Sequence, residues 1–379
     1  MPLIYLVAGE ASGDALGARL IAALRVRRPD LTFAGIGGRL MEAQGLVSLF
    51  PMQEIALMGL LEVLPKLRML RRRLAEAHAD ILARAPAIVI TIDSPGFTLR
   101  LLRKLAGGPV PAIHYVAPQV WAWREGRVRS YHGLWRDLLC LLPFEPAFFA
   151  RHGLAAHFVG HPVLESGADT GDAQRLRAAH NIPADAPVLL LLPGSRLGEV
   201  RRLAPRFELA AKSLRAAHPN LVCLLIAAPA ISAQLRALVA DWQPSPIVID
   251  DDADKHDAFA AATAALTKSG TANLELALAG VPMVVAYRVN PVSAAIARRL
   301  ITIKFASLVN LLSGRELVPE LIQENATPQA FAAAIAPLLA GGPAADAQRA
   351  GFATLRAALT PPEGTPSQAA AAAVLARLA

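Results

Sequence analysis

The sequence predicts an α/β protein with two parallel-sheet halves. At 379 residues, the chain is longer than a single core usually serves. Short runs that are apolar throughout, such as LIYLVA, AIVITID, VLLLLPGSR and PMVVAY, indicate strands that are covered on both faces of a parallel sheet. Helical patterns such as residues 14–27 separate several of these runs, and a composition with 54% hydrophobic but only 5% aromatic residues suits helix-rich layers.

A polar stretch divides the two halves. It follows VGHPVL at 159–164 and lasts to about residue 186, after which the alternation of strands and helices restarts. We therefore expect domains at 1–165 and 166–344, followed by an Ala-rich helical tail at 345–379. Two Rossmann-like halves that face each other bind ligands at the carboxyl ends of their strands, so the loops after strands should carry the chemistry.

Charge and cysteine content limit the function classes. The formal net charge of +8 favours phosphorylated ligands, nucleic acid or an anionic membrane surface. Cys140 and Cys223 lie in apolar runs, which predicts buried thiols and weakly indicates a reducing compartment. The first apolar run lacks a basic flank, and no run approaches 18 apolar residues, so the sequence predicts a cytoplasmic protein.

The first loop, VAGEASGDALG, follows the first predicted strand. Its glycines, Gly9, Gly13 and Gly17, fit neither the dinucleotide-binding spacing nor the Walker pattern, which also requires a lysine. This disfavours a dehydrogenase or a P-loop NTPase. The remaining interpretations are a structural turn or a turn that meets substrate, with Asp14 or Ser12 as the helix cap.

Asp93 in TIDSPGF stands at the end of another predicted strand. A free aspartate titrates near 3.9, and partial burial beside Pro95 and Phe97 would raise its pKa towards that of a useful base. A structural role for a strand-terminal aspartate is the alternative.

Two loops of the second half are suited to phosphate. LLPGSRLGEV places the guanidinium of Arg196 at the mouth of a strand-to-helix loop, although a solvated arginine is the alternative. In LTKSGTANLELALAG a strand ends at Thr267 and a helix starts at about Ala272. The residues between them are expected to bind a diphosphate, and an acidic residue one turn into the helix is expected to bind the attached sugar. These residues are Ser269, Gly270 and Thr271 for the diphosphate and Glu275 for the sugar. A capping role for Glu275 stays open.

Two further segments have competing interpretations. The acidic run DDDADKHD at 250–257 lacks the residues of a calcium loop, so it is expected to cap a helix near Lys255 and not to hold metal. YVAPQVWAWREGRVRSY brings Trp121, Trp123 and Arg124 together, which could stack on sugars or bases. No nucleic-acid signature accompanies them, and a buried tryptophan pair beside solvated arginines is the alternative.

Segment 58–74 places apolar residues just before a helix that is expected to start at Pro65, and basic residues along that helix. This pairing is typical of a surface that rests on an anionic membrane, although an ordinary helix packed on its own core would look similar. The residues expected to contact the membrane are Met58, Leu61, Leu64, Arg68, Arg71 and Arg72.

Taken together, these stretches resemble the lipid-A-disaccharide synthase family, inverting glycosyltransferases of the GT-B fold. The resemblance extends over nearly the whole chain through AGEASGD, GIGGRLM, MGLLEVL, IDSPGF, HYVAPQVWAWR, LPFE, FVGHPV, LLPGSR, SGTANLE, PMVVAYR and LVNLLSGRELVPELIQ. It implies transfer of 2,3-diacylglucosamine from its UDP donor to the 6-hydroxyl of 2,3-diacylglucosamine 1-phosphate (lipid X), giving a β-1,6 disaccharide and UDP without metal or cofactor. In GT-B folds a C-terminal helix often returns to the first domain.

The resemblance also implies roles for individual residues. Asp93 takes the place of the proposed base, and UDP binding falls on Arg196, Ser269, Gly270, Thr271, Glu275 and Asn310. We expect acceptor-side contacts from Glu10, Ser12, Gly13, His114, Trp123 and Arg124. The chain departs from the family pattern at Thr98, Ala117, Gln119 and Val309, and the first departure weakens any role for residue 98 in orienting substrate.

The implied partners are the two lipid substrates and an anionic inner-membrane surface, with no nucleic acid. Peripheral attachment on the cytoplasmic side is expected, and a homodimer with an exchanged tail stays open. The alternatives are another UDP-sugar enzyme of this fold, such as a peptidoglycan-precursor transferase or a UDP-N-acetylglucosamine 2-epimerase, and a binding module without catalysis. An epimerase would act without a lipid acceptor, and a binding module would retain its ligand.

Overall fold

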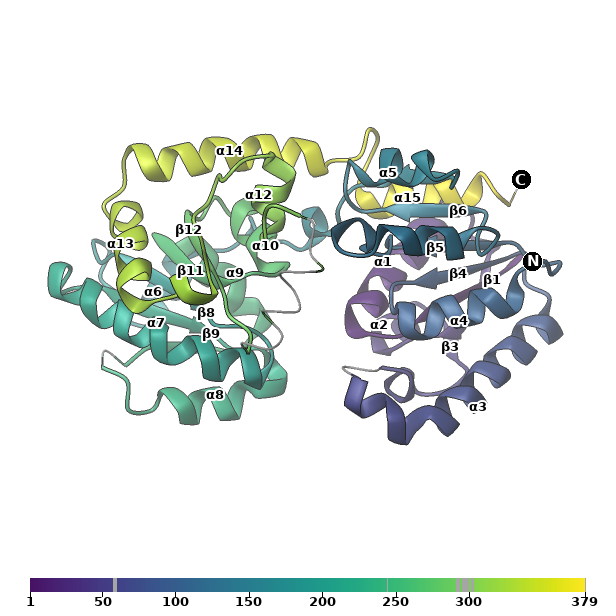
Figure 1. Ribbon diagram of the computed structural model, residues 1–379, viewed down its shortest axis with the longest axis horizontal. Coiled ribbons are helices and arrows are strands. Elements are labelled where there is room, and N and C mark those ends of the chain that lie inside the picture. The colour runs from purple at the N-terminus through teal and green to yellow at the C-terminus, as the bar shows by residue number, and fades with distance from the viewer. Residues whose placement is uncertain (57–59, 244, 291–293, 295–299, 301–302, 379) are drawn as a thin grey trace. The chain divides into compact units, whose positions relative to one another are not determined.

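The computed structural model divides the chain into two compact units, residues 1–162 with 359–379, and residues 163–358. It describes all residues except 57–59, 244, 291–293, 295–299, 301–302 and 379, and it describes residues 60–66 and 252 without their side chains (Figure 1). Every strand pair in the described residues is parallel, as the unbroken apolar runs predict.

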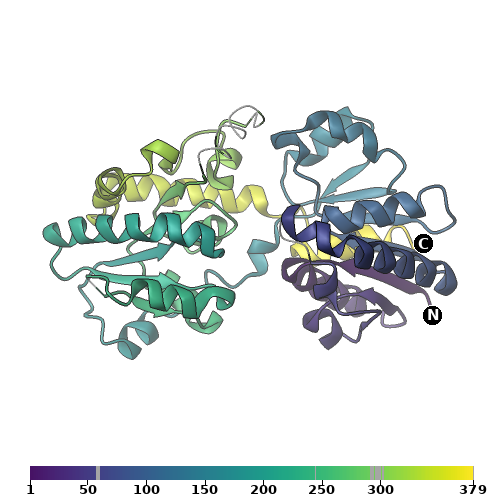
Figure 2. The same ribbon diagram turned by 60° about the horizontal axis from the view of Figure 1, so that its bottom comes forward.

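The first unit contains a seven-stranded sheet in the order β3-β2-β1-β4-β5-β6-β7. Its strands are β1 (Leu3–Ala8), β2 (Thr32–Ile36), β3 (Val47–Ser48), β4 (Ile88–Ile92), β5 (Ala112–Tyr115), β6 (Asp137–Cys140) and β7 (Ala156–Phe158). One face packs against α1 (Ala11–Arg27) and the last helix, α15 (Pro366–Leu375), which contact each other (Figure 1). The other face packs against α3 (Leu60–Arg84), α4 (Pro95–Leu105) and α5 (Glu145–Arg151); α3 and α4 lie side by side in both views (Figure 2).

Short elements connect these layers. They are α2 (Arg39–Ala43) and the 3₁₀ helices η1 (Met52–Glu54), η2 (Val120–Ala122) and η3 (Glu125–Tyr131). Helix α3 begins at Leu60, five residues before the expected start at Pro65. The prediction was wrong because it took Pro65 as the first helical residue, whereas the preceding LLEVL is made mostly of good helix formers.

The second unit contains a six-stranded sheet in the order β10-β9-β8-β11-β12-β13. Its strands are β8 (Val188–Leu192), β9 (Val222–Ile226), β10 (Ile247–Ile249), β11 (Ala264–Lys268), β12 (Met283–Tyr287) and β13 (Glu320–Ile322). Its helices are α6 (Ala173–Ala179), α7 (Leu197–Ala217), α8 (Ser232–Val239), α9 (Asp252–Ala261), α10 (Ala272–Leu278), α12 (Leu308–Ser313), α13 (Pro328–Leu339) and α14 (Pro343–Leu359). Helices α7 and α13 bury Phe207 against Phe331, and this pair lies in the core cluster of the unit.

The C-terminal tail does not act as one piece. Helix α14 remains with the second unit, where Gln348 exchanges two hydrogen bonds with the backbone of Met283, at 2.7 and 3.1 Å. Only residues 359–379 belong to the first unit. The expected boundary at 344/345 thus falls at 358/359, because a buried side chain fixes the earlier helix before the chain leaves the second unit.

Candidate active site

Asp93 follows β4 on a strained and well-anchored turn. Asp93 and Ser94 have φ angles of 46° and 48°, a left-handed conformation that residues with side chains rarely adopt. The amide of Asp93 donates to the carbonyl of Tyr115 at 2.9 Å. The hydroxyl of Thr98 donates to the carbonyl of Asp93 at 2.6 Å and lies 3.0 Å from that of Ser94. Thr98, where the family pattern has another residue, therefore supports the backbone that carries the carboxylate.

The surroundings of Asp93 favour its protonated form. The side chain is half-buried at the carboxyl end of the sheet, and burial raises the pKa of its carboxyl above the ordinary aspartate value, partly offset by a hydrogen bond from the backbone of Ser94. This is the direction that the sequence predicts for a base.

The opening turn lies directly against this aspartate turn. A Cβ at Gly9 would stand 2.4 Å from the hydroxyl oxygen of Ser94, so only glycine allows the approach. Ser12 is exposed, Glu10 is half-buried just before α1, and Gly13 packs against β1 and β4. The turn is thus placed beside the candidate base.

The predicted cap of α1 was wrong. Glu10 occupies the N-cap position without a side-chain cap bond, and Asp14 accepts hydrogen bonds from the amides of Gly38, Leu40 and Met41 at 2.8–3.0 Å. Asp14 therefore caps the neighbouring helix α2 instead, because a long-range partner competes with the local one.

His114 lies in the core, not on an acceptor-binding surface. It is 1% exposed on β5, its Nδ1 is 2.7 Å from the hydroxyl of Thr91, and its ring stacks on Trp135. Burial lowers the pKa of His114 to about 4, so the ring is neutral. His114 therefore serves in core packing in this structure, and its expected contact with the acceptor stays a prediction.

Trp123 and Arg124 are exposed. Trp123 is 40% exposed, and the guanidinium of Arg124 stacks 4.2 Å above its ring centroid. A flat, cationic surface of this kind can contact a sugar phosphate. The neighbouring Trp121 turns inward and donates its indole N–H to Glu145 at 3.1 Å.

Glu145 was missed by the sequence analysis. It is 2% exposed and also accepts the amides of Leu141 and Leu142, at 3.1 and 3.0 Å. Burial raises the pKa of Glu145 to about 7. An acidic residue set in the apolar run LLCLLPFEP was the available signal, because a lone carboxylate among apolar residues needs internal donors.

In the second unit, Arg196 lies at the start of α7 with a side chain that is 68% exposed. Gly194 before it has a φ of 124°, and a Cβ there would stand 2.6 Å from a carboxylate oxygen of Glu199. The loop after β8 therefore presents an accessible guanidinium above a glycine turn, as expected of a phosphate-binding loop.

In the loop after β11 and the helix that follows it, some of the candidate side chains form hydrogen bonds within the protein. The hydroxyl of Ser269 donates to the carbonyl of Ala306 at 2.7 Å, whereas Thr271 is exposed. Glu275 accepts two hydrogen bonds from Lys255, at 2.9 and 2.7 Å. Helix α10, with seven residues, begins at Ala272, where the sequence predicts it.

Asn310 has a different position from the one expected. It is fully buried; its Oδ1 accepts the amides of Leu317 and Val318, and its Nδ2 donates to the carbonyl of Val318 and the carboxylate of Glu320, all at 2.8–2.9 Å. These four bonds use the whole capacity of the amide. Asn310 therefore holds the segment before β13 through four hydrogen bonds, and its expected contact with UDP stays a prediction.

The acidic run at 250–257 serves as helix support. Asp251 caps α9, and the buried Asp257 pairs with Arg175. No group of three or more His, Cys, Asp or Glu side chains in the described residues is arranged to hold a metal ion.

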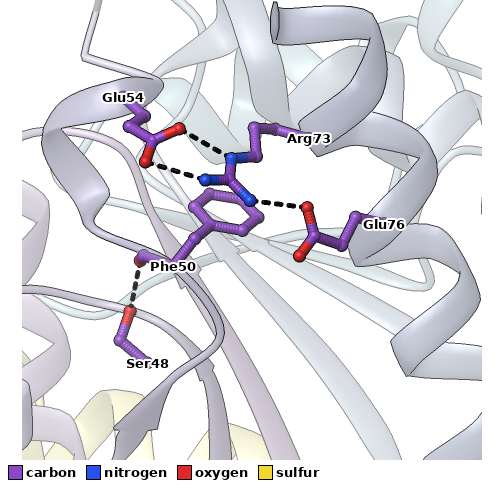
Figure 3. Close-up of polar contacts among 5 residues, drawn as sticks. All are labelled: Ser48, Phe50, Glu54, Arg73 and Glu76. Carbon is purple, nitrogen blue, oxygen red and sulfur yellow. Dashed lines mark hydrogen bonds and ion pairs between the residues drawn. The ribbon is translucent and has the colours of Figure 1, made fainter.

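The basic segment of α3 is split between surface and interior. Arg68, Arg71 and Arg72 are exposed, whereas Arg73 turns inward, where its guanidinium stacks 4.6 Å from the ring centroid of Phe50. Figure 3 shows Arg73 between Glu54 and Glu76, with hydrogen bonds of 2.7–2.8 Å. Met58 and the side chains of Leu61 and Leu64 lie outside the described residues.

Within the described residues, no single helix is long and apolar enough to cross a bilayer. Helices α13 and α14 pass the same length and composition test together, across an 83° bend. Phe331 and Ile335 of α13 lie in the core of the second unit.

Comparison with known proteins decides the family. The profile of the lipid-A-disaccharide synthetase family matches residues 4–374. The lipid-A-disaccharide synthase of Gluconobacter oxydans is 55% identical over 373 residues, which cover 98% of this chain and 90% of that protein. The chain belongs to the lipid-A-disaccharide synthetase family. The synthase of Granulibacter bethesdensis is 52% identical, with 99% and 98% of the two chains covered.

Solved structures agree with this family in fold. The calicheamicin glycosyltransferase CalG4 matches with a TM-score of 0.63 at 18% identity, covering 100% of this chain and 98% of that one. The UDP-GlcNAc 2-epimerase of Neisseria meningitidis matches with a TM-score of 0.59 at 11% identity, covering 99% of each chain. The synthetase family member described here therefore has the two Rossmann-like units of GT-B glycosyltransferases, and it is a glycosyltransferase by family.

Proposed function

We propose that this chain transfers 2,3-diacylglucosamine from its UDP donor to the 6-hydroxyl of 2,3-diacylglucosamine 1-phosphate, with inversion and release of UDP. The observation that carries the chemistry is Asp93, half-buried on its strained turn with a raised pKa. The acceptor hydroxyl must lose a proton as it attacks the anomeric carbon, and a positioned carboxylate can take that proton.

The second unit supports the donor side of the proposal. Arg196 offers a guanidinium to the diphosphate, and Thr271 offers an exposed hydroxyl at the neighbouring loop. These groups stabilise negative charge that gathers on the departing UDP.

The test is UDP release measured with each lipid substrate omitted in turn. Release that requires both substrates supports the transferase; release from the donor alone indicates an epimerase or hydrolase instead. Asp93→Asn should lower kcat by about 10²–10⁴-fold with the thermal unfolding curve unchanged. Unchanged turnover in that variant would remove Asp93 as the base.

We also propose that the protein works at the cytoplasmic surface of the inner membrane. Arg68, Arg71 and Arg72 lie together on the exposed part of α3, where they can meet anionic headgroups. Binding to vesicles with anionic lipid should weaken as salt rises and weaken further in the triple Arg→Gln variant. The triple variant Arg201→Gln, Arg202→Gln and Arg215→Gln on α7 removes the same number of charges elsewhere and should bind as the wild type does. Binding that ignores both salt and the α3 charges would contradict the proposal.

A further inference from the structure

A largely buried ion pair connects the loops after β8 and β11, the two candidate phosphate-binding loops of the second unit. Strands β8 and β11 are neighbours, with Leu192 paired to Thr267, so their carboxyl-end loops lie next to each other. Across these loops the ammonium of Lys268 is 3.1 Å from Glu199 Oε1. Both side chains are mostly covered, with 21% and 18% of their surface exposed.

The carboxylate of Glu199 collects donors from both loops. Arg196 Nη1 is 3.8 Å from the same Oε1, and the amide of Ser195 donates to Oε2 at 3.2 Å. The ammonium of Lys268 also reaches over the second loop, 3.9 Å from the place where a Cβ of Gly270 would stand. An ammonium, a guanidinium and a backbone N–H around one anionic group are the set of donors that binds phosphate in proteins.

We propose that Lys268 is a further binding residue for the donor diphosphate, and that Glu199 is an internal counter-ion that the diphosphate displaces from Lys268 and Arg196. This inference rests on the proposed function. In the free enzyme Glu199 neutralises the two cations. When a diphosphate enters, its oxygens take over the contacts, and Lys268 stabilises the charge on the leaving group. After transfer, Glu199 competes with UDP for the same cations and so assists its release.

The proposal is tested by calorimetric binding of UDP and of uridine to the full chain. Lys268→Met should weaken UDP binding by about 10–100-fold, and kcat/KM should fall by about 10²-fold. Glu199→Gln should tighten UDP binding by about 10-fold, because a like charge beside the phosphates is removed. Uridine, which lacks phosphate, should bind the wild type and both variants equally. Lys212→Met on the exposed part of α7 is the matched control and should bind UDP as the wild type does.

Two outcomes overturn the proposal. If Glu199 only holds the Ser195 loop in shape, Glu199→Gln will weaken UDP binding and lower the unfolding temperature. If Lys268 only balances Glu199, Lys268→Met will leave UDP affinity unchanged. Arg196→Ala and the UDP-release assay separate this inference from the proposed function. Weaker UDP binding in Arg196→Ala with no effect of Lys268→Met defeats only the role of Lys268, whereas UDP release that needs no lipid acceptor defeats the function.

Discussion

Thr98 shows how one hydroxyl can support a candidate catalytic carboxylate through its backbone, without touching the carboxylate itself. Thr98 belongs to the first turn of α4, and its Oγ1 donates to the carbonyl of Asp93, which is one of two consecutive residues in the left-handed conformation. Such backbone strain persists only where neighbouring contacts hold it. The sequence could predict Asp93 from its position after a strand, but not this support, because it depends on the conformation of the turn.

Replacing that hydroxyl gives a test at the residue scale. Thr98→Val keeps the shape of the side chain but removes the donor, so the free energy of unfolding should fall by about 1–2 kcal/mol and kcat should fall as Asp93 loses its fixed position. Denaturant unfolding and the UDP-release assay measure the two effects. Thr98→Ser retains the hydroxyl and should restore most of kcat; a serine variant as impaired as the valine variant would mean that packing, and not the hydrogen bond, matters.

The pH profile gives a second test of Asp93. A base must be ionised to accept a proton, and burial raises the pKa of this carboxyl. The acidic limb of kcat/KM should therefore lie above the ordinary aspartate value of about 3.9. Asp93→Asn should abolish the limb in its residual activity. A limb that persists in the asparagine variant would belong to another group.

At the scale of elements, the segment with Trp121, Trp123 and Arg124 is held by one buried acid. Glu145, the first residue of α5, joins the indole of Trp121 to the amides after β6. The sequence predicts that the aromatic and basic residues gather after β5. It does not separate the inward Trp121 from the outward Trp123, because neither residue type nor spacing shows which side meets the core.

Glu145→Gln should destabilise the first unit by about 1–3 kcal/mol, because the new NH₂ group faces donors that lose their acceptor. The loss should also depend on pH. Since the folded pKa of Glu145 is raised to about 7, this group favours the folded state most at low pH, and its contribution falls as pH rises through 7. Urea unfolding of the wild type and of Glu145→Gln should be measured from about pH 5 to about pH 8. The difference between their free energies of unfolding should become smaller as pH rises. A constant gap would contradict the raised pKa.

Strand and helix types were predictable at this scale, and most errors lay at their ends. The apolar runs gave β1, β4, β8 and β12 because strands covered on both faces need no polar positions. Helix α3 was placed too short, and Asp14 caps α2 across space. Ends depend on caps and contacts from distant residues, which sequence periodicity does not contain.

At the scale of the whole molecule, residues 359–379 return to the unit that contains residues 1–162. The buried Asp137 of β6 binds Arg377 through two hydrogen bonds at 2.6 and 2.8 Å and also contacts His157 at 2.7 Å. These contacts fix the segment after α15 to the first unit. The family resemblance implied a returning helix, but only the structure divides the tail between α14 and α15.

Arg377→Ala should lower the Tm of the first unit by a few degrees, because Asp137 remains buried and loses its main cationic partner. Hydrogen bonds from Arg377 and His157 hold the pKa of Asp137 below its usual value despite burial. The stabilisation is therefore present above an unfolded pKa of about 3.9 and is lost as pH falls through the lower folded value. Differential scanning calorimetry should show the Tm difference from wild type shrinking at acidic pH. Arg349→Ala, on the exposed side of α14, is the control and should leave Tm unchanged.

The late arrival of α15 has a consequence for synthesis on the ribosome. The sheet face formed by Ile4, Leu6 and Ile90 is completed by Ala370, Ala371 and Val374, which are translated only after residues 163–358. The second unit, residues 163–358, is translated between these two parts. A nascent chain can therefore finish the inserted unit while its first residues still expose an uncovered apolar layer. Loss of residues 359–379 would leave that layer as a target for chaperones and proteases.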